Sequence, residues 1–190
     1  MENNIFYNAI FHTKSILQHK KYVMYYCCKA GLFWQGVSHD LSKFSATEFI
    51  PGVKYYNGKC SPNSIQKKKE GFSSSWIHHK NSNKHHCEYW LDYSDQRYNE
   101  TGEKISAIKM PNKYLVEMFC DRLAACRVYR GSSFSNSDPL NYYLERRECM
   151  IIHDKTRTVL EKLLKLFAVY GEDKAFRYAR YLLNSDSKVS

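Results

Sequence analysis

"MPNKYLVEMFCDRLAACRVYRG", residues 110–131, is the stretch that decides the fold. Pro111 suits the first turn of a helix, and Gly131 suits the position just after a helix ends. Between them, apolar side chains recur every three or four residues, the spacing that gives a helix one buried face. These side chains are Leu115, Met118, Phe119, Leu123 and Cys126. The stretch predicts a long amphipathic helix packed into a core.

Patterns on both sides of this stretch also indicate helices. Residues 5–30 carry spaced apolar side chains with no internal Gly or Pro. The other expected helical segments are 37–52, stopping at Pro51-Gly52, 74–92 in two pieces broken near 81–83, 140–153, 156–170 and 172–183. We expect an ordered loop with one short helix at 53–73, a polar loop at 95–104 and a frayed end at 184–190. Because no run of alternating β-branched residues occurs, the predicted class is all-α.

Length and composition fit a protein of the cytoplasm. The 190 residues are most economically one domain. No segment approaches the ~20 apolar residues of a membrane helix, and the N-terminal residues lack a secretory signal. The seven cysteines are an odd number without a CxxC pair, which argues against a zinc knuckle and predicts free thiols. The sequence does not indicate an oligomeric state.

The net charge of +10 favours anionic partners. Phosphorylated small molecules, nucleic acid or an acidic protein surface would each be attracted. We expect no membrane partner.

"WIHHKNSNKHHCEYW", residues 76–90, holds two adjacent pairs of histidines. Neutral imidazole is the commonest metal ligand in proteins. On one unbroken helix, His79 and His86 would share a face with Cα atoms about 10.5 Å apart. That spacing suits two ions about 3.5–4 Å apart better than one. We take His79 and His86 as ligands, and we expect His78 and His85 either to contact the ligands from behind or to face substrate, although the sequence does not decide within either pair.

His39-Asp40 is the second candidate for metal binding. Adjacent residues on a helix point about 100° apart, so both can touch one ion only if it lies in the angle between them. The two oxygens of Asp40 could bridge two ions. Lys43 would share a helix face with Asp40 and could hold an anionic group against the metals.

"HDLSK", residues 39–43, resembles the signature of the HD superfamily of metal-dependent phosphohydrolases. The resemblance implies an HD-like helical bundle over 1–190, with a metal-binding core at about 12–131 and C-terminal helices at about 140–183. It also implies an upstream histidine, two further histidines in two-metal members, and a distal aspartate. The residues in that order are His19, His39, Asp40, His79, His86 and Asp121. They would hold two divalent ions, either Fe, Mn or Zn.

At finer grain the chain resembles the bacterial family domain of unknown function 5662. The matching stretches are "GVSHDLSKFSATEFIPGVKYY", "SWIHHKNSNKHHCEYW", "MPNKYLVEMFCDRLAA" and "DPLNYY", which cover about 15–145. One departure is Asn81-Ser82, where we expect Gly-Arg in relatives. If that arginine binds substrate in relatives, this chain does without it.

The leading functional hypothesis is hydrolysis of a phosphate monoester or diester, possibly a nucleotide. Asp40, Lys43 and Arg122 are the expected catalytic residues. The expected substrate-binding residues are Lys43, Lys80, Asn83, Lys84, Arg122, His78 and His85. Glu48 or Glu88 could orient a histidine, while His12 and His153 are expected to be structural.

Two alternatives remain. The same two-metal scaffold supports di-iron oxygenases that cleave C–C or C–P bonds with O₂. A nucleic-acid-binding protein with a structural metal is the third hypothesis. The excess of candidate ligands over the four of a closed zinc site argues against it.

Overall fold

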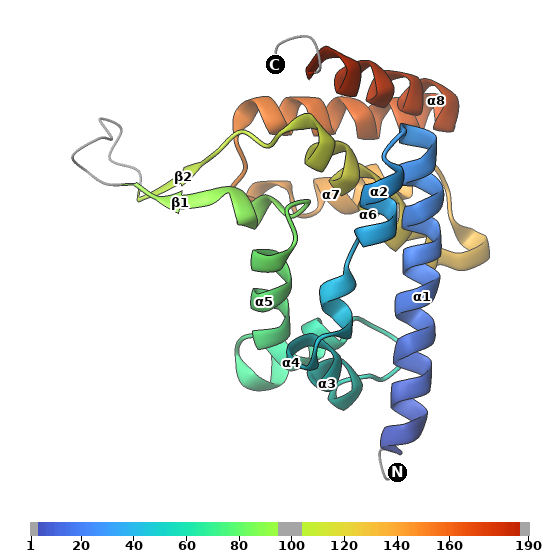
Figure 1. Cartoon of the computed structure of the whole chain (residues 1–190), viewed down its shortest axis with the longest axis vertical. Helices are drawn as coiled ribbons and strands as arrows, with labels where there is room; N and C mark the ends of the chain where they lie inside the picture. Colours follow the sequence, from blue (N-terminus) through green and yellow to red (C-terminus); the bar gives the residue numbers. More distant parts are fainter. Residues whose placement is uncertain (1–3, 95–103, 187–190) are drawn as a thin grey trace.

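The computed structural model describes residues 4–94 and 104–186, and these are mostly helical (Figure 1). The helices are α1 (Ile5–Ala30), α2 (Phe33–Ser38), α3 (Ala46–Lys54), α4 (Pro62–Glu70), α5 (Ser74–Ser82), α6 (Asn112–Arg130), α7 (Asp138–Leu144) and α8 (Asp154–Asp186). Short 3-10 turns are η1 (Leu41–Phe44), η2 (Cys87–Trp90), η3 (Gly131–Ser133) and η4 (Arg147–Cys149). The predicted all-α class is confirmed.

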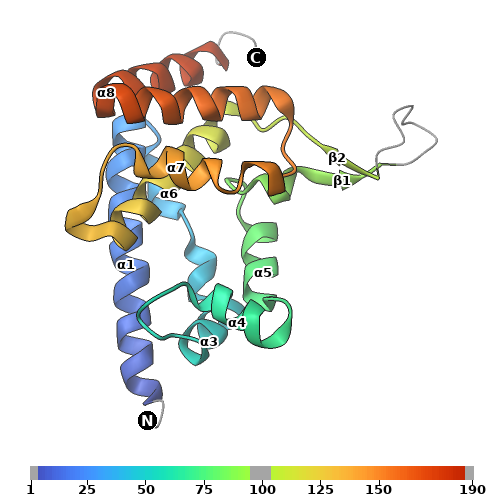
Figure 2. The ribbon, with the colours of Figure 1, turned by 180° about the vertical axis from the view of Figure 1, so that it is seen from behind.

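Helix α6 forms the middle of the core, and α1 and α8 pack against it. The five side chains of its predicted apolar stripe are all buried. The ring of Phe119 meets those of Phe167 and Phe176 on α8, with centroids 6.1 and 5.7 Å away. The core therefore joins helices from the two ends of the chain. Figure 2 shows α1 running from the end formed by α3 and α4 to the end formed by α8.

Several helix ends follow from local sequence. The side chain of Asn4 accepts a hydrogen bond from the Tyr7 amide at the start of α1. Gly31 ends α1 with φ 87°, a left-handed conformation that glycine adopts without steric cost. Gly171 has φ 72° and ψ −162° inside α8. The helices predicted at 156–170 and 172–183 are therefore the two arms of one bent element (Figure 1).

The prediction of a helix at 140–153 is largely wrong. α7 ends at Leu144, and only a 3-10 turn follows before α8. The guanidinium of Arg157 donates to the carbonyls of Arg147 and Met150, which stabilises this non-helical segment. His153 Nδ1 accepts a hydrogen bond from the Lys155 amide and so caps α8. The structural role expected for His153 is therefore met.

Two further expectations about backbone structure fail. The segment 37–52 is not one helix, and α3 continues through Pro51 to Lys54. An antiparallel ribbon of β1 (Leu91–Tyr93) and β2 (Ile105–Ala107) was not expected. Strands of three residues are too short to give a readable alternation. The polar loop expected at 95–104 and the frayed end at 184–190 lie largely outside the described residues.

The state of the cysteines can be compared with the prediction of free thiols. All seven cysteines are free thiols, as the odd count predicts. Burial raises the pKa of Cys87 to about 12 and that of Cys126 to about 11, so both stay protonated near neutral pH.

Across residues 4–94 and 104–186, no helix is both long enough and apolar enough to span a bilayer.

Gly52 gives a test of how α1 and α3 pack. A Cβ at position 52 would lie 2.2 Å from His12 Nε2 on α1. The His12 ring is flanked by Phe49 and Tyr56, with centroids 5.6 and 6.0 Å away. Because this overlap forces the ring to move, we expect Gly52→Ala to lower the free energy of unfolding by about 1–3 kcal/mol. Urea denaturation measures the change.

The effect of Gly52→Ala should reverse sign in a His12→Ala background. Without the ring, alanine is favoured over glycine inside a helix by roughly 0.5–1 kcal/mol. An equal loss of stability in both backgrounds would show that the contact with His12 is not the cause.

Candidate metal centre

Seven histidine and aspartate side chains converge where α1, α5, α6 and the turn after α2 approach one another. They form two ligand groups, and in each group one ligand atom per residue lies within 4.8 Å of the others. The first ligand group is His19, His39, Asp40 and Asp121. The second ligand group is Asp40, His79, His85 and His86.

Asp40 belongs to both ligand groups and turns a different oxygen towards each. Its Oδ2 lies 3.8 Å from His19 Nε2 and 3.4 Å from His39 Nε2. Its Oδ1 lies 3.4 Å from His79 Nε2 and 3.3 Å from His85 Nε2. The two oxygens of this one carboxylate therefore face two different sets of histidines.

The backbone at Asp40 differs from the expected helix. Asp40 has φ 54° and ψ 27°, the left-handed region. Aspartate tolerates this region better than most residues, yet such a conformation costs about 1–3 kcal/mol. Lys20 on α1 stabilises the turn by donating from Nζ to the carbonyls of Val37 and His39, at 2.6 and 2.9 Å. The turn lets His39 and Asp40 face the same cluster without a helix.

Two buried glutamates orient three of the histidines. Glu117 Oε1 lies 2.9 Å from His39 Nδ1 and 3.2 Å from His85 Nδ1. Glu48 Oε2 lies 2.8 Å from His79 Nδ1. A carboxylate at Nδ1 fixes the tautomer in which Nε2 is free to bind a metal. Sequence reasoning named Glu48 but missed Glu117.

A local signal could have identified Glu117. It stands one turn before Asp121 on α6, among the apolar residues of the buried stripe. A carboxylate is rarely buried without a partner, so its position already indicated a buried polar contact. Glu88, the other candidate, instead lies 3.6 Å from Lys80 and beside Cys87.

The inward-facing atoms of these side chains lack the partners that buried groups normally have. Nε2 of His39, His85 and His86 and Oδ1 of Asp40 are buried without a hydrogen-bond partner. Buried polar atoms are nearly always hydrogen-bonded because an unpaired one costs free energy. Imidazole nitrogens and carboxylate oxygens are suitable ligands for Fe, Mn or Zn. The residues present therefore fit divalent ions.

The electrostatics of the centre also suit a cation. Burial alone would lower the pKa of His39, but the carboxylates of Asp40, Asp121 and Glu117 raise it well above the usual value. Burial alone would raise the pKa of Asp40, but His39 and Lys43 hold it well below the usual value. Without metal, protonated imidazole supplies positive charge that a divalent ion would replace.

The first ligand group is the more accessible to solvent. The side chains of His19 and Asp121 are 13% and 20% exposed, against 2% for His79 and 2% for His85 in the second group. Lys43 lies at this edge, with Nζ 2.6 Å from Asp40 Oδ2 and a side chain 27% exposed. A small molecule that approaches the centre from this side would meet the ammonium group of Lys43.

The structure places His85 differently from the expectation. His85 was expected to face substrate, but it joins His86 in the second ligand group. This arrangement is possible because the helix ends at Ser82 and His86 has extended backbone. His78 is 38% exposed and its Nδ1 lies 2.7 Å from Glu48 Oε1, outside both ligand groups.

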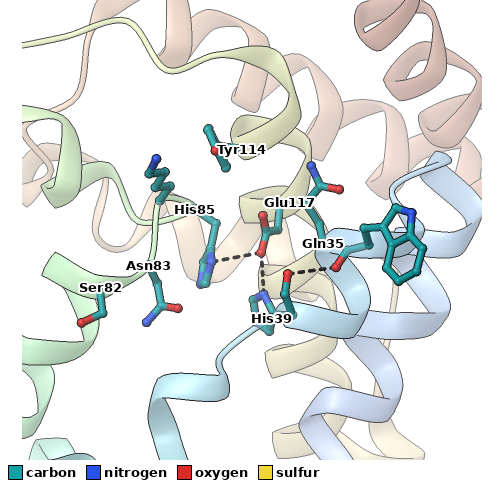
Figure 3. A pocket seen from close by; sticks show the side chains of 10 residues that line it. Gln35, His39, Ser82, Asn83, His85, Tyr114 and Glu117 are labelled. Carbon is teal, nitrogen blue, oxygen red and sulfur yellow. Dashed lines mark hydrogen bonds and ion pairs between the residues drawn. The ribbon is translucent and has the colours of Figure 1, made fainter.

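Three of the expected substrate-binding residues, Asn83, Lys84 and His85, line a pocket of about 400 Å³ beside His39 (Figure 3). Asn83 and Lys84 contribute to this pocket, together with Trp34, Gln35 and Tyr114. Asn83 also donates to Ser42 Oγ and to the His79 carbonyl.

The remaining two expected substrate-binding residues face other partners. The guanidinium of Arg122 lies over the Tyr143 ring and contacts Met150 Sδ. This placement differs from the expected position beside the metals, because on α6 Arg122 points about 100° away from Asp121. Lys80 is paired with Glu88.

Comparison with known proteins gives one match. Residues 8–166 match the family of unknown function DUF5662. No curated protein and no solved structure matches the chain. The matched range covers well over half of the sequence and includes both ligand groups and Glu117. The chain therefore belongs to the family of unknown function DUF5662.

Proposed function

We propose that this protein is a metal-dependent phosphohydrolase acting on a phosphate monoester or diester. The observation that carries the proposal is the carboxylate of Asp40, whose two oxygens face two different sets of histidines. Such an arrangement suits two ions held close together. On this proposal His39 and Asp40 correspond to the His-Asp pair of the HD superfamily, with His19 and Asp121 as its outer ligands.

The residues of the chain have distinct parts in this reaction. Bound divalent ions would polarise a phosphoryl oxygen and would lower the pKa of a bound water to near neutral pH. Asp40 links the two ligand groups, because each of its two oxygens faces one of them. Lys43, at the exposed edge, binds a phosphate oxygen through its ammonium group. The net charge of +10 attracts an anionic substrate.

The proposal is tested with nucleotides and phosphate esters assayed without oxygen in the presence of Mn²⁺. Phosphate release by the wild type, lost in Asp40→Ala, is the expected result. A parallel assay follows O₂ consumption by the Fe-loaded protein, because the same histidine-rich groups suit iron. Substrate-dependent O₂ uptake without ester hydrolysis would favour a di-iron oxygenase. Retention of nucleic acid with a steep salt dependence, and neither reaction, would favour the nucleic-acid-binding alternative.

Lys43→Ala should weaken phosphate binding without loss of metal or fold. Lys43 is partly exposed and contributes its charge at the edge of the first ligand group. Loss of a charge-assisted hydrogen bond of about 1.5–3 kcal/mol predicts a roughly 10- to 100-fold weaker inhibition by inorganic phosphate. Metal content and circular dichroism should match the wild type. Loss of helicity would instead make Lys43 a structural partner of Asp40.

A further inference from the structure

Glu117 makes a contact that joins the two ligand groups from behind. Its Oε1 lies 2.9 Å from Nδ1 of His39, which belongs to the first group. The same oxygen lies 3.2 Å from Nδ1 of His85, which belongs to the second group. Figure 3 shows both rings directed at the carboxylate. A single oxygen atom thus holds one histidine of each group.

The two rings that share Glu117 are also packed against each other. Their centroids are 4.2 Å apart and their planes differ by 32°. With Nδ1 donating to Glu117, each ring turns Nε2 towards an oxygen of Asp40. The direction of both Nε2 atoms therefore depends on where the Glu117 carboxylate lies.

Glu48 provides a contrast within the same centre. It is as buried as Glu117, each being 6% exposed. Its Oε2 accepts from Nδ1 of His79, a member of the second group, and its Oε1 lies 2.7 Å from Nδ1 of His78. Glu48 therefore orients one ligand histidine, His79, which belongs to the second group.

We infer that Glu117 is a positioning residue shared by both metal ions, whereas Glu48 positions the second ion alone. The inference rests on the two-metal centre proposed above but not on the reaction it performs. Once a first ion fixes the His39 ring, the carboxylate of Glu117 is already ordered for His85. Binding of one ion thereby lowers the ordering cost of the other.

The test compares Glu117→Gln with Glu48→Gln, since both remove one buried carboxylate charge. Co²⁺ binding is measured by equilibrium dialysis, and its visible absorption spectrum reports the geometry of each ion. Asp121→Ala and His86→Ala give the reference spectra of a centre lacking one ligand of the first or the second group. Loss of a carboxylate that orients a ligand typically weakens metal binding about 10- to 100-fold.

Glu117→Gln should weaken the binding of both Co²⁺ ions and change the absorption spectrum of each. Glu48→Gln should weaken the second ion and leave the first at wild-type affinity with an unchanged spectrum. Weakening of only one ion in Glu117→Gln, or equal weakening of both ions in Glu48→Gln, overturns the inference. If Glu117→Gln does not fold, Glu117→Asp is used, which retains the charge and should still weaken both ions.

Failure of this inference and failure of the proposed reaction give different results. A wild type that binds two ions and hydrolyses no phosphate ester, with Glu117→Gln weakening both, upholds the inference and refutes the phosphohydrolase. A wild type that binds no Co²⁺ refutes both.

Discussion

Asp40→Ala should be purified with neither metal ion, whereas the wild type should hold two per chain. Asp40 is the one residue that belongs to both ligand groups among the described residues, and its two oxygens face different histidines. Its removal also leaves the buried histidines without the carboxylate between them. Elemental analysis of protein purified without chelator measures the stoichiometry of Fe, Mn, Zn, Ni and Co.

Variants that change one ligand group should lose one ion. Asp121→Ala affects the first group and His86→Ala the second. His78→Ala is the matched histidine control, because His78 contacts Glu48 and lies outside both groups, so it should retain two ions. A wild-type protein with almost no metal, and no uptake on reconstitution, would refute the metal centre.

Chelation should lower the melting temperature of the wild type substantially. An ion present at about 1,000 times its Kd stabilises the folded state by roughly 4 kcal/mol. For a chain of this size, each kcal/mol corresponds to about 2–4 °C. Removing even one such ion should therefore lower the melting temperature by about 8–16 °C. Differential scanning calorimetry with and without chelator measures the shift.

The control for chelation is Asp40→Ala, which should melt at the same temperature with and without chelator. Its ligand groups hold no ion to remove. A wild type whose melting temperature does not respond to chelator, although two ions are present by elemental analysis, would place those ions outside the folded core.

The effect of chelation should grow as the pH rises from 6 to 8. Although burial opposes it, Asp40 and the other carboxylates raise the pKa of His39 above its unfolded value of 6.5. In the metal-free protein, the stability that protonated His39 contributes is complete below this unfolded pKa of 6.5. It is lost as the pH rises through the raised folded pKa. Metal affinity changes the other way, because ions bind the deprotonated Nε2. Melting temperatures at several pH values, with and without chelator, test the sign.

Local sequence determined much of the helical framework. The apolar spacing in 110–131 placed α6 to within two residues and identified its buried side chains. Gly131 marked the end of α6, and the helix expected at 5–30 has the same bounds as α1. These features could be predicted because helix periodicity and capping depend on residues only a few positions apart.

The choice of ligands was only partly available from the sequence. His19, His39, Asp40 and Asp121 were named in the order of a resembling superfamily, and the structure brings these four together. For the pair His85-His86 the sequence could not decide, because both rings reach the centre only where the helix has ended. A helical spacing rule does not apply to such a segment.

The sequence by itself determined an all-α chain and the residue types able to bind metal. Only the tertiary structure decided that Asp40 takes a left-handed turn held by Lys20 and that Arg122 faces Tyr143. It also decided that Glu117 orients His39 from 78 positions away. The physical reason is that a helix is specified by near neighbours, whereas the direction of a buried side chain is set by the partners that packing brings to it.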